Sequence, residues 1–511
     1  MLPAWLYHSL NELEQSDYAE IKLIIGSDAE TPKTSFFSRL NHLCYRLFLK
    51  FEKRIFKLDP NAFALVDCKK LFAKKTSFGF DEFESIKKEE LDILLCLDSG
   101  VASLPLVACA KFGVWGFGTQ EYEQAAQAFF KNKSSFFSKL QMWQEGKEQV
   151  MLVAQTYSST EDISLNRNLN KHYWKVAGFI PNALKQLHHL GEDAFFQNKQ
   201  EVEVSPLQLL GQPSNVVVLA GVFSKYWQKL KQKITNRFYF EQWILLFQVN
   251  QDGKTPFDFK DYKRILPPKD RFWADPFGME RNGQYYIFFE ELPFSTNKGH
   301  ISVMQVFEDG TQSTSEIILE KPYHLSYPFL FEEDGELYML PETSENSTIE
   351  LYKCIEFPKK WELEKVLMNE ICAVDSTIWK KDGKYCLFTN VRMLEGASKH
   401  DELHLYYADS LLADEWRPHP QNPIVSDVRS ARPAGKIFEK EGKWYRPSQD
   451  CSVRYGYGMQ IAEIISLEED KYKERIIEYI EPNWSKDLLA THSFNQENRF
   501  SVIDALIQRK K

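Results

Sequence analysis

Four segments in the second half of the chain share one pattern of apolar and polar positions. Each contains an apolar strand, a charged turn that ends in glycine, and a second strand in which aromatic residues recur. Aligned on the turn glycines Gly283, Gly335, Gly383 and Gly442, the copies recur at intervals of about fifty residues, a spacing typical of propeller blades. An acidic or amide residue precedes each glycine, as in tight hairpin turns. The pattern therefore predicts four blades, each containing one such hairpin.

Two further strand-like runs lie at the ends of this region. YFEQWILLFQ occupies residues 239–248 and FSVIDALIQ occupies residues 500–508. Pairing the first run with the last closes a ring of blades and removes the exposed sheet edges. We therefore expect an all-β, five-bladed β-propeller over residues 238–511.

The first part of the chain has a different pattern, because strand-like runs alternate there with helical periodicity. The runs cover residues 21–26, 62–67, 91–98 and 112–118. Such alternation predicts a parallel sheet of the α/β, Rossmann-type class. We expect this domain to span residues 1–190, and a connector with a basic helix to span residues 191–237.

Residues 33–57 combine basic side chains with a helical apolar stripe. The stripe consists of Phe36, Leu40, Leu43, Leu47, Phe51 and Ile55. Glu52 is the one acidic residue in this range. Two interpretations remain open: the helix packs its apolar face on the sheet, or it lies on an anionic membrane surface as a peripheral contact.

Composition narrows the class of protein. The 511 residues are 43% hydrophobic, 26% charged and 14% aromatic, which predicts a globular protein of two or three domains. A net charge of -9 gives no reason to expect nucleic acid as a partner. The eight cysteines form no CxxC pair, so we expect free thiols, no metal and no cofactor. The chain opens on MLPAWLYHSLNELEQ, which does not read as a signal peptide, and we expect a cytoplasmic protein.

The candidate chemistry lies where blades meet the axis, because the first strand of each blade lines that channel. The aligned inner positions are Asp275, Tyr327, Asp375 and the segment around Arg432. Paired carboxylates are what glycoside hydrolysis requires, one to donate a proton and one to accept it. We predict Asp275, Asp375 and Glu342 as catalytic residues. The alternative is structural, since an Asp before Pro or Ser also caps turns.

A dense polar run follows in residues 429–458. Arginines recognise carboxylates and phosphates bidentately, so this run suits a phosphorylated or acidic sugar, unless it is only a solvated strand edge. The predicted substrate-binding residues are Arg271, Trp273, His324, Tyr327, Arg429, Arg432, Arg446, Gln449, Asp450, Arg454, Tyr455 and His492.

Several of these motifs resemble known families. FWADPFG resembles the first-blade signature of five-bladed propeller glycosidases, whose Asp is a nucleophile or base, although their third carboxylate, a Glu on a later blade, has no convincing match here. DRFWADPFG, HLSYPF, DSTIW, ARPAGKIF and RPSQDCSVRYG resemble the N-terminal-domain family of glucosamine inositolphosphorylceramide transferase, over residues 240–508. That resemblance implies a sugar, phosphosugar or glycolipid substrate.

The first domain resembles the formyltransferase-like domain of bacterial surface-glycan proteins, over residues 2–190. The resemblance rests on PLVACAKFGVWGFG and on SLNRNLNKHYWKVAGFIPNALKQL. The family's Asn and His are absent from GVWGFGTQEY, and the chain opens at the helix that follows the family's first strand, so we expect a degenerate domain whose first strand is missing or encoded upstream. Three functions remain open: glycosyl transfer or cleavage in surface glycan or glycolipid assembly (a polysaccharide biosynthesis role), non-catalytic glycan binding, and formyl transfer to an amino sugar.

Overall fold

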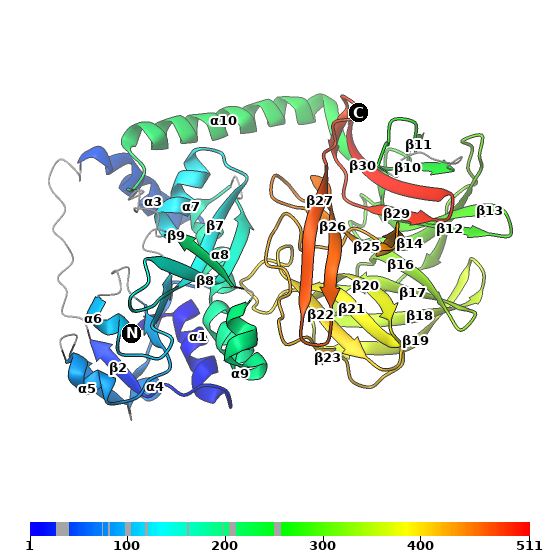
Figure 1. Ribbon diagram of the computed structural model, residues 1–511. Coiled ribbons are helices and arrows are strands. Elements are labelled where there is room, and N and C mark those ends of the chain that lie inside the picture. Colours follow the sequence, from blue (N-terminus) through cyan, green and yellow to red (C-terminus); the bar gives the residue numbers. More distant parts are fainter. Residues whose placement is uncertain are drawn as a thin grey trace. The chain divides into compact units, whose positions relative to one another are not determined.

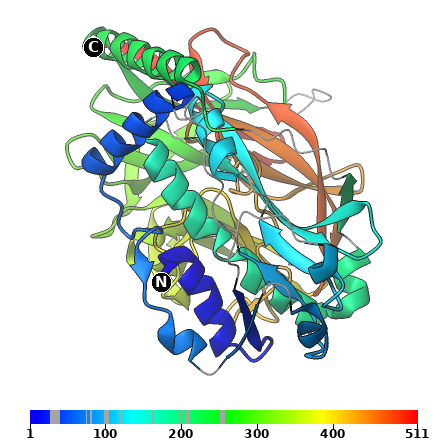
Figure 2. The same cartoon turned by 90° about the vertical axis from the view of Figure 1, so that its left-hand side faces the viewer.

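The chain divides into two units, one for each half of the sequence pattern. The computed structural model describes residues 1–26, 40–73, 75–79, 82–97, 104–117, 121–160, 163–197, 199–203, 211–249 and 257–511. One unit comprises Met1–Gln228 with Leu394–Ser398, and the other comprises Lys229–Met393 with Lys399–Lys511. Figure 1 shows the second unit as a ring of sheets, and Figure 2 gives a second view of the chain.

The second unit is a five-bladed propeller, as the repeats predict. Four blades follow one another in the chain, and each pairs its four strands in sequence order. Blade one contains β12 (Arg271–Arg281), β13 (Gln284–Pro293), β14 (His300–Val306) and β15 (Glu316–Leu319). Blade two contains β16 (Ser326–Glu333), β17 (Glu336–Thr343), β18 (Thr348–Glu356) and β19 (Lys360–Asn369). Blade three contains β20 (Ala373–Lys381), β21 (Lys384–Val391), β22 (Leu403–Ala408) and β23 (Arg417–Pro418). Blade four contains β24 (Phe438–Lys440), β25 (Lys443–Asp450), β26 (Gly458–Leu467) and β27 (Tyr472–Ile480).

Blade five joins both ends of the region. It contains β10 (Tyr239–Val249), β11 (Lys263–Ile265), β28 (Leu488–Ala490), β29 (Phe494–Glu497) and β30 (Phe500–Lys510). β10 and β30 are antiparallel along their full length, from Tyr239 opposite Lys510 to Val249 opposite Phe500. The predicted pairing of the first strand with the last is confirmed. It supplies hydrogen-bond partners to strand edges that, if exposed, could pair with another chain and cause aggregation.

The four turn glycines have the conformation that the hairpins require. Gly283, Gly335, Gly383 and Gly442 have φ between 72° and 79°, a region that suits glycine best. The residue before each also has positive φ, as in two-residue turns in which both central positions are left-handed.

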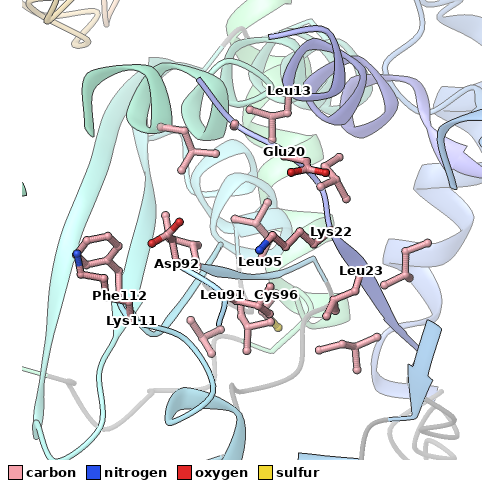
Figure 3. Close-up of a pocket in the computed structure, with 18 of the residues that line it drawn as sticks. Leu13, Glu20, Lys22, Leu23, Leu91, Asp92, Leu95, Cys96, Lys111 and Phe112 are labelled. Carbon is pink, nitrogen blue, oxygen red and sulfur yellow. The ribbon is translucent and has the colours of Figure 1, made fainter. Parts of the chain in front are cut away.

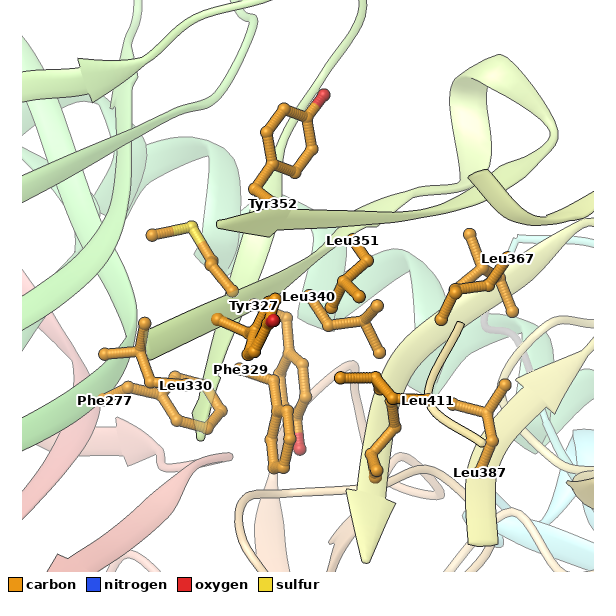
Figure 4. Close-up of a cluster of buried hydrophobic side chains, with 14 of the residues drawn as sticks. Phe277, Tyr327, Phe329, Leu330, Leu340, Leu351, Tyr352, Leu367, Leu387 and Leu411 are labelled. Atoms are coloured by element: carbon orange, nitrogen blue, oxygen red, sulfur yellow. The ribbon is translucent and has the colours of Figure 1, made fainter. Parts of the chain in front are cut away.

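Within the blades, side chains alternate between the two faces of each strand, and apolar side chains fill the space between neighbouring sheets. Figure 4 shows one such cluster, which includes Phe277.

The first unit is an α/β structure whose described strands fall into three sheets. β1 (Leu2–Pro3) pairs antiparallel with β3 (Leu65–Val66), and β2 (Leu23–Gly26) pairs parallel with β4 (Thr76–Gly79). The third sheet has the order β5 (Leu94–Cys96), β6 (Val114–Phe117), β7 (Ser135–Trp143), β8 (Gln149–Ser159) and β9 (Gln200–Glu203).

The prediction of one parallel sheet is wrong for the described strands. Only the β2–β4 and β5–β6 pairs are parallel, and β6 to β9 run antiparallel. The reason is local: a tight turn with Gly146 at φ 72° joins β7 directly to β8, and strands joined by a hairpin are antiparallel. Residues assigned to the connector also do more than connect, because β9 completes this sheet.

Helices pack around these sheets. They are α1 (Ala4–Gln15), α3 (Leu43–Ile55), α4 (Lys69–Phe72), α5 (Phe83–Lys87), α6 (Leu104–Val107), α7 (Glu121–Phe130), α8 (Leu165–Val176), α9 (Phe179–Gln197) and α10 (Asn215–Phe238). In the described part of the chain, no helix has the length and apolarity needed to cross a membrane.

One interpretation is that residues 33–57 pack their apolar stripe on the sheet, and it is wrong for residues 40–57, which the structure describes. Leu40, Leu43, Leu47, Phe51 and Ile55 are all exposed, and Phe36 lies outside the described residues. The helix instead packs through its opposite face. A helical period identifies an apolar face but does not say toward what it points.

Candidate active site at the propeller axis

Three blades bring a polar side chain to the axis by the same backbone device. In β12, β16 and β20 the pairing with the next strand slips by a bulge, between Ala274 and Phe277 in the first of them. Asp275, Tyr327 and Asp375 lie inside these bulges with φ of 50°, 44° and 52°. Left-handed backbone is uncommon for residues other than glycine and costs free energy, and bulges redirect side chains. The sequence repeats predict that these three positions are equivalent, and the structure confirms it, because each lies in the bulge of the first strand of its blade.

Asp275 faces an imidazole held between two carboxylates. His492 Nε2 lies 3.1 Å from Asp275 Oδ1, and His492 Nδ1 lies 2.8 Å from Asp504 Oδ2. All three side chains are buried, and neither contact is aligned as a hydrogen bond, so the interaction is mainly electrostatic. Burial disfavours the imidazolium, but the charges of Asp504 and Asp275 outweigh it and raise the pKa of His492 to about 10. The ring is therefore cationic at neutral pH.

Asp504 anchors this arrangement. Its Oδ1 accepts from the backbone N–H groups of His492 (2.9 Å) and Ser493 (3.2 Å), and its Oδ2 accepts from the Ser493 hydroxyl (2.8 Å) and from the Asp275 N–H (3.1 Å). Burial opposes ionisation, yet His492 and these hydrogen bonds lower the pKa of Asp504. Asp275, Asp504 and His492 also offer ligand atoms within 4.8 Å of one another. One imidazole and two carboxylates are a set that could hold a metal ion.

Asp375 is paired with an arginine from the fourth blade. Arg432 donates from Nε to Asp375 Oδ2 (2.5 Å) and from Nη2 to Oδ1 (3.0 Å), which is the bidentate geometry. Gln449 Nε2 donates to the same Oδ2 (2.6 Å). Arg432 Nη2 also contacts Glu342 Oε2 (3.3 Å), and Arg432 Nη1 lies 2.9 Å from His400 Nδ1. Two carboxyl groups thus share one guanidinium in a buried site.

Two carboxyl groups this close do not ionise independently. Burial, with the charges of Glu342 and Asp275, raises the pKa of Asp375 to about 8, although Arg432 opposes the shift. Burial also disfavours ionisation of Glu342, but there Arg432 outweighs it and lowers the pKa. The pair therefore holds one proton at neutral pH, and that proton belongs to both groups.

Tyr327, in the second blade, bonds to residues of the first and third blades. Its backbone N–H donates to Asp275 Oδ2 (3.3 Å), and its hydroxyl lies 3.0 Å from Thr377 Oγ1 on β20. The side chain is fully buried and packs edge-on against Phe277. It acts as a support between blades one and three.

Aromatic rings close around the cations of the axis. The Tyr455 ring stacks on the Arg432 guanidinium at 5.0 Å and lies 5.3 Å from the His492 ring. The Trp243 ring centre lies 4.2 Å from the His492 ring centre. Tyr455 is 42% exposed, so it separates solvent from a buried charged network. Aromatic rings in that position also suit the apolar face of a sugar.

His324 belongs to a neighbouring pair. Its Nε2 lies 3.2 Å from Glu290 Oε1, and its Nδ1 accepts a hydrogen bond from the Gly299 N–H (2.9 Å). That acceptor role places the proton of the neutral ring on Nε2, toward Glu290. Burial raises the pKa of Glu290, whose charge also interacts with Asp275. This pair therefore adjoins the axis.

The predicted arginines have different carboxylate partners. Arg429 pairs with Asp427, Arg454 with Glu241, and Arg271 with Asp270 and Glu291. Arg446 is buried against Glu474. Of the predicted arginines, Arg432 is the one that contacts the axis carboxylates.

The other predicted contacts have local roles. Trp273 is buried beside Phe289, and Asp450 Oδ1 accepts from the Ser452 N–H (2.8 Å). Three axis residues escaped sequence reasoning: Asp504, His400 and Trp243. Asp504 carried a signal, because an acidic residue in the apolar run FSVIDALIQ is rarely buried without a partner. His400 carried none.

The N-terminal unit has a separate cavity of about 1370 Å³. It is lined by β2, β5 and the helices α1 and α9, and Figure 3 shows Lys22 and Asp92 among mainly apolar side chains. Residues 118–120, within the segment where a formyltransferase carries its Asn and His, lie outside the described residues. Formyl transfer therefore stays a prediction.

Comparison with known proteins places the sequence similarity in the propeller. Residues 266–499 match the family described as glucosamine inositolphosphorylceramide transferase 1, N-terminal. A glucosamine inositolphosphorylceramide transferase 1 from Oryza sativa subsp. japonica is 38% identical over 206 residues, which are 40% of this chain and 27% of that protein. A glucosamine inositolphosphorylceramide transferase 1 from Arabidopsis thaliana is 37% identical over 206 residues, which are again 40% of this chain and 27% of that protein. The chain thus matches about a quarter of the length of these relatives.

Solved structures with similar folds are glycosidases of low sequence identity. RS223-Beta-xylosidase is 15% identical, with a TM-score of 0.32, and the match covers 46% of this chain and 94% of that one. The catalytic domain of a Coprinopsis cinerea GH62 alpha-L-arabinofuranosidase is 11% identical, with a TM-score of 0.36, covering 46% and 90%. The five-bladed architecture of this chain rests on its own sheet pairing.

Proposed function

We propose that the propeller axis is a carbohydrate-active site that transfers or cleaves a glycosyl group. The observation that carries this proposal is the division of labour between two buried carboxyl groups. Asp275 Oδ1 accepts no hydrogen bond from the described residues, whereas Asp375 shares a proton with Glu342 at neutral pH. One group can accept a proton while the other donates one, which is the pairing that glycosyl chemistry uses.

The reaction follows from these roles. Asp275 takes the proton of an acceptor hydroxyl or of water, whose oxygen attacks the anomeric carbon. The bond from that carbon to the leaving oxygen breaks, and the leaving oxygen receives the proton that Asp375 and Glu342 share. His492 and Asp504 act as positioning residues, because they hold Asp275 through the contacts described above. Arg432 and Gln449 position Asp375 in the same way.

The charge of the axis indicates what kind of sugar fits. Four carboxyl groups, Asp275, Glu342, Asp375 and Asp504, face two cations, Arg432 and His492. With one shared proton an excess negative charge remains, which disfavours a phosphate at the axis and favours hydroxyl groups or an ammonium group. An amino sugar meets that requirement, and the relatives carry glucosamine in their name.

The test is turnover in a matched pair of variants. We expect Asp275→Asn to lower glycosyl transfer or hydrolysis about 100- to 10,000-fold, because the amide cannot take a proton. Asp487→Asn is the control, since Asp487 pairs with Arg264 on the surface. Nucleotide sugars and amino-sugar glycosides are screened first by thermal shift, and product is then followed by mass spectrometry. Undiminished turnover in Asp275→Asn would refute the proposal.

A second candidate, a non-catalytic glycan-binding module, is favoured by one observation. Asp375 is buried and doubly bound by Arg432 and Gln449, as a structural carboxylate is. This alternative predicts that sugar binding survives Asp275→Asn and that no product forms with either protein.

A further inference from the structure

Helix α3 lies in the N-terminal unit, helix α10 begins there and continues past its end at Gln228, and both helices have apolar outward faces. On α10, a stripe at helical spacing is exposed: Val216 (76%), Leu219 (59%), Phe223 (69%), Tyr226 (67%), Leu230 (36%) and Ile234 (56%). On α3 and just before it, the same holds for Leu40 (54%), Leu43 (39%), Leu47 (57%), Phe51 (59%) and Ile55 (54%). A soluble helix usually turns such a stripe inward. We call these two stripes the outer faces of α3 and α10.

The inner faces show why the stripes point outward. Tyr45 and Phe48 of α3 and Val218 of α10 pack into one cluster with α7 and α8. The starts of the two helices are also tied together, since Asn215 Oδ1 accepts from the Cys44 N–H (2.8 Å) and Asn215 Nδ2 donates to the Leu40 carbonyl (2.8 Å). Each helix is thus held in the core by one face and leaves the opposite one uncovered by the described residues.

The buried charges of the same helices support this orientation. Glu52 is buried and accepts hydrogen bonds from the Ser164 hydroxyl and the Asn166 N–H, both at 2.8 Å. Lys225 is buried with its ammonium group 4.2 Å from the centre of the Phe129 ring. Each helix therefore buries one charged residue beside its inner apolar side chains, while a second apolar stripe stays exposed.

The exposed charges around the stripes are cationic. Residues 215–238 contain five lysines and arginines and no acidic residue, in a chain whose net charge is -9. Lys50, Lys53 and Arg54 on α3 and Lys229 and Lys233 on α10 are exposed. An apolar face with aromatic side chains and flanking cations is the pattern of helices that lie in a membrane interface.

We propose that the outer faces of α3 and α10 dock the protein on an anionic lipid surface. The helices lie in the interface and do not cross it, consistent with the lack of a spanning helix among the described residues. α10 has 24 residues, so about 36 Å of helix is available for contact. A second copy of this chain fits less well, because it would bring the same cations face to face. The inference is independent of the chemistry at the propeller axis.

The test is co-flotation of the full chain with vesicles. We expect strong binding to phosphatidylcholine vesicles that contain phosphatidylglycerol, weak binding to phosphatidylcholine alone, and release by salt. The pair Leu219→Glu with Phe223→Glu on α10, or Leu47→Glu with Phe51→Glu on α3, is expected to lower binding at least about tenfold. Replacing Lys229 by Gln is expected to lower it about fivefold, as is replacing Lys233.

Ile477→Glu with Tyr479→Glu is the matched control, because these apolar residues are also exposed but lie on β27. It is expected to bind vesicles as the unaltered chain does. Three results would overturn the proposal: no binding to anionic vesicles at low salt, equal binding to neutral and anionic vesicles, or equal binding by the helix variants. A concentration-dependent dimer that the Phe223→Glu pair dissociates, without vesicle binding, would assign the surface to a second copy instead.

Discussion

The two units of this protein treat polar and apolar groups in opposite ways. The propeller buries charge: Asp275, His492, Asp504, Asp375 and Arg432 all lie inside it, each with a partner of opposite sign. The N-terminal unit exposes apolar surface on α3 and on the first part of α10, and it contains a large cavity beside β2 and β5. A closed ring has no sheet edges to protect and can afford a charged centre, because its blades hold the partners in place. The α/β unit leaves apolar helix faces exposed.

The largest effect is expected where the propeller's buried charge is broken. Asp504→Ala removes the acceptor of four hydrogen bonds and leaves the His492 cation with one carboxylate instead of two. We expect a loss of about 3–5 kcal/mol in the free energy of unfolding of the propeller. Calorimetry that resolves two transitions is the measurement. An unchanged propeller transition would show that the network does not hold the blades together.

Raising the pH is expected to destabilise the propeller and to stabilise the N-terminal unit. The pKa of His492 is raised to about 10 in the folded propeller, so its contribution is complete below about 6.5 and is lost as pH rises through 10. Burial lowers the pKa of Lys199, in the N-terminal unit, to about 8. The free-energy cost of burying its charged ammonium group therefore falls as the pH rises from about 8 toward 10.5.

Between pH 7 and 10, the propeller transition is therefore expected to move to lower temperature while Lys199 stabilises the other unit. His492→Gln is the control for the first effect, because it removes one titrating group and should reduce the slope to the part that Asp375, with a pKa raised to about 8, contributes in the same direction. Parallel shifts of both transitions would contradict the assignment of these two groups.

The sequence predicted the propeller well because its signals are local. Each turn glycine and the residue before it determine one hairpin, and the recurrence of Asp275, Tyr327 and Asp375 reports one bulge repeated in three blades. The partners of the arginines were out of reach, because Arg446 meets Glu474 and Arg454 meets Glu241 only after folding.

In the N-terminal unit the missing information was direction. Periodicity showed that residues 33–57 have an apolar face but not that Leu47 and its neighbours face outward. Alternating strands and helices likewise predicted parallel pairing, although β7 and β8 are joined by a hairpin and pair antiparallel. The first error concerns contacts distant in sequence, whereas the second is local, because the turn at Gly146 joins β7 to β8 as an antiparallel hairpin.

A moderate effect is expected at the buried carboxylate of the N-terminal unit. Glu52→Ala removes the acceptor for the Ser164 hydroxyl and for the Asn166 N–H at the start of α8. Leaving those donors without a partner is expected to cost about 1–3 kcal/mol, less than Asp504→Ala costs the propeller. Glu52→Gln keeps an oxygen acceptor and is expected to cost less than Glu52→Ala. A larger effect of Glu52→Ala than of Asp504→Ala in the same calorimetric experiment would reverse the comparison between the units.

The smallest effect is expected at a turn where the propeller departs from its own pattern. The hairpin turns of blades one to three use Asn282, Asp334 and Asp382 before glycine, whereas blade four uses Glu441 at φ 53°. Asn adopts left-handed backbone more readily than Glu, because its short side chain bonds locally. Glu441→Asn is expected to stabilise the propeller by roughly 0.5–1 kcal/mol and to leave the N-terminal transition in place. A loss of stability would mean that Glu441 makes a contact that outweighs the strain of its backbone.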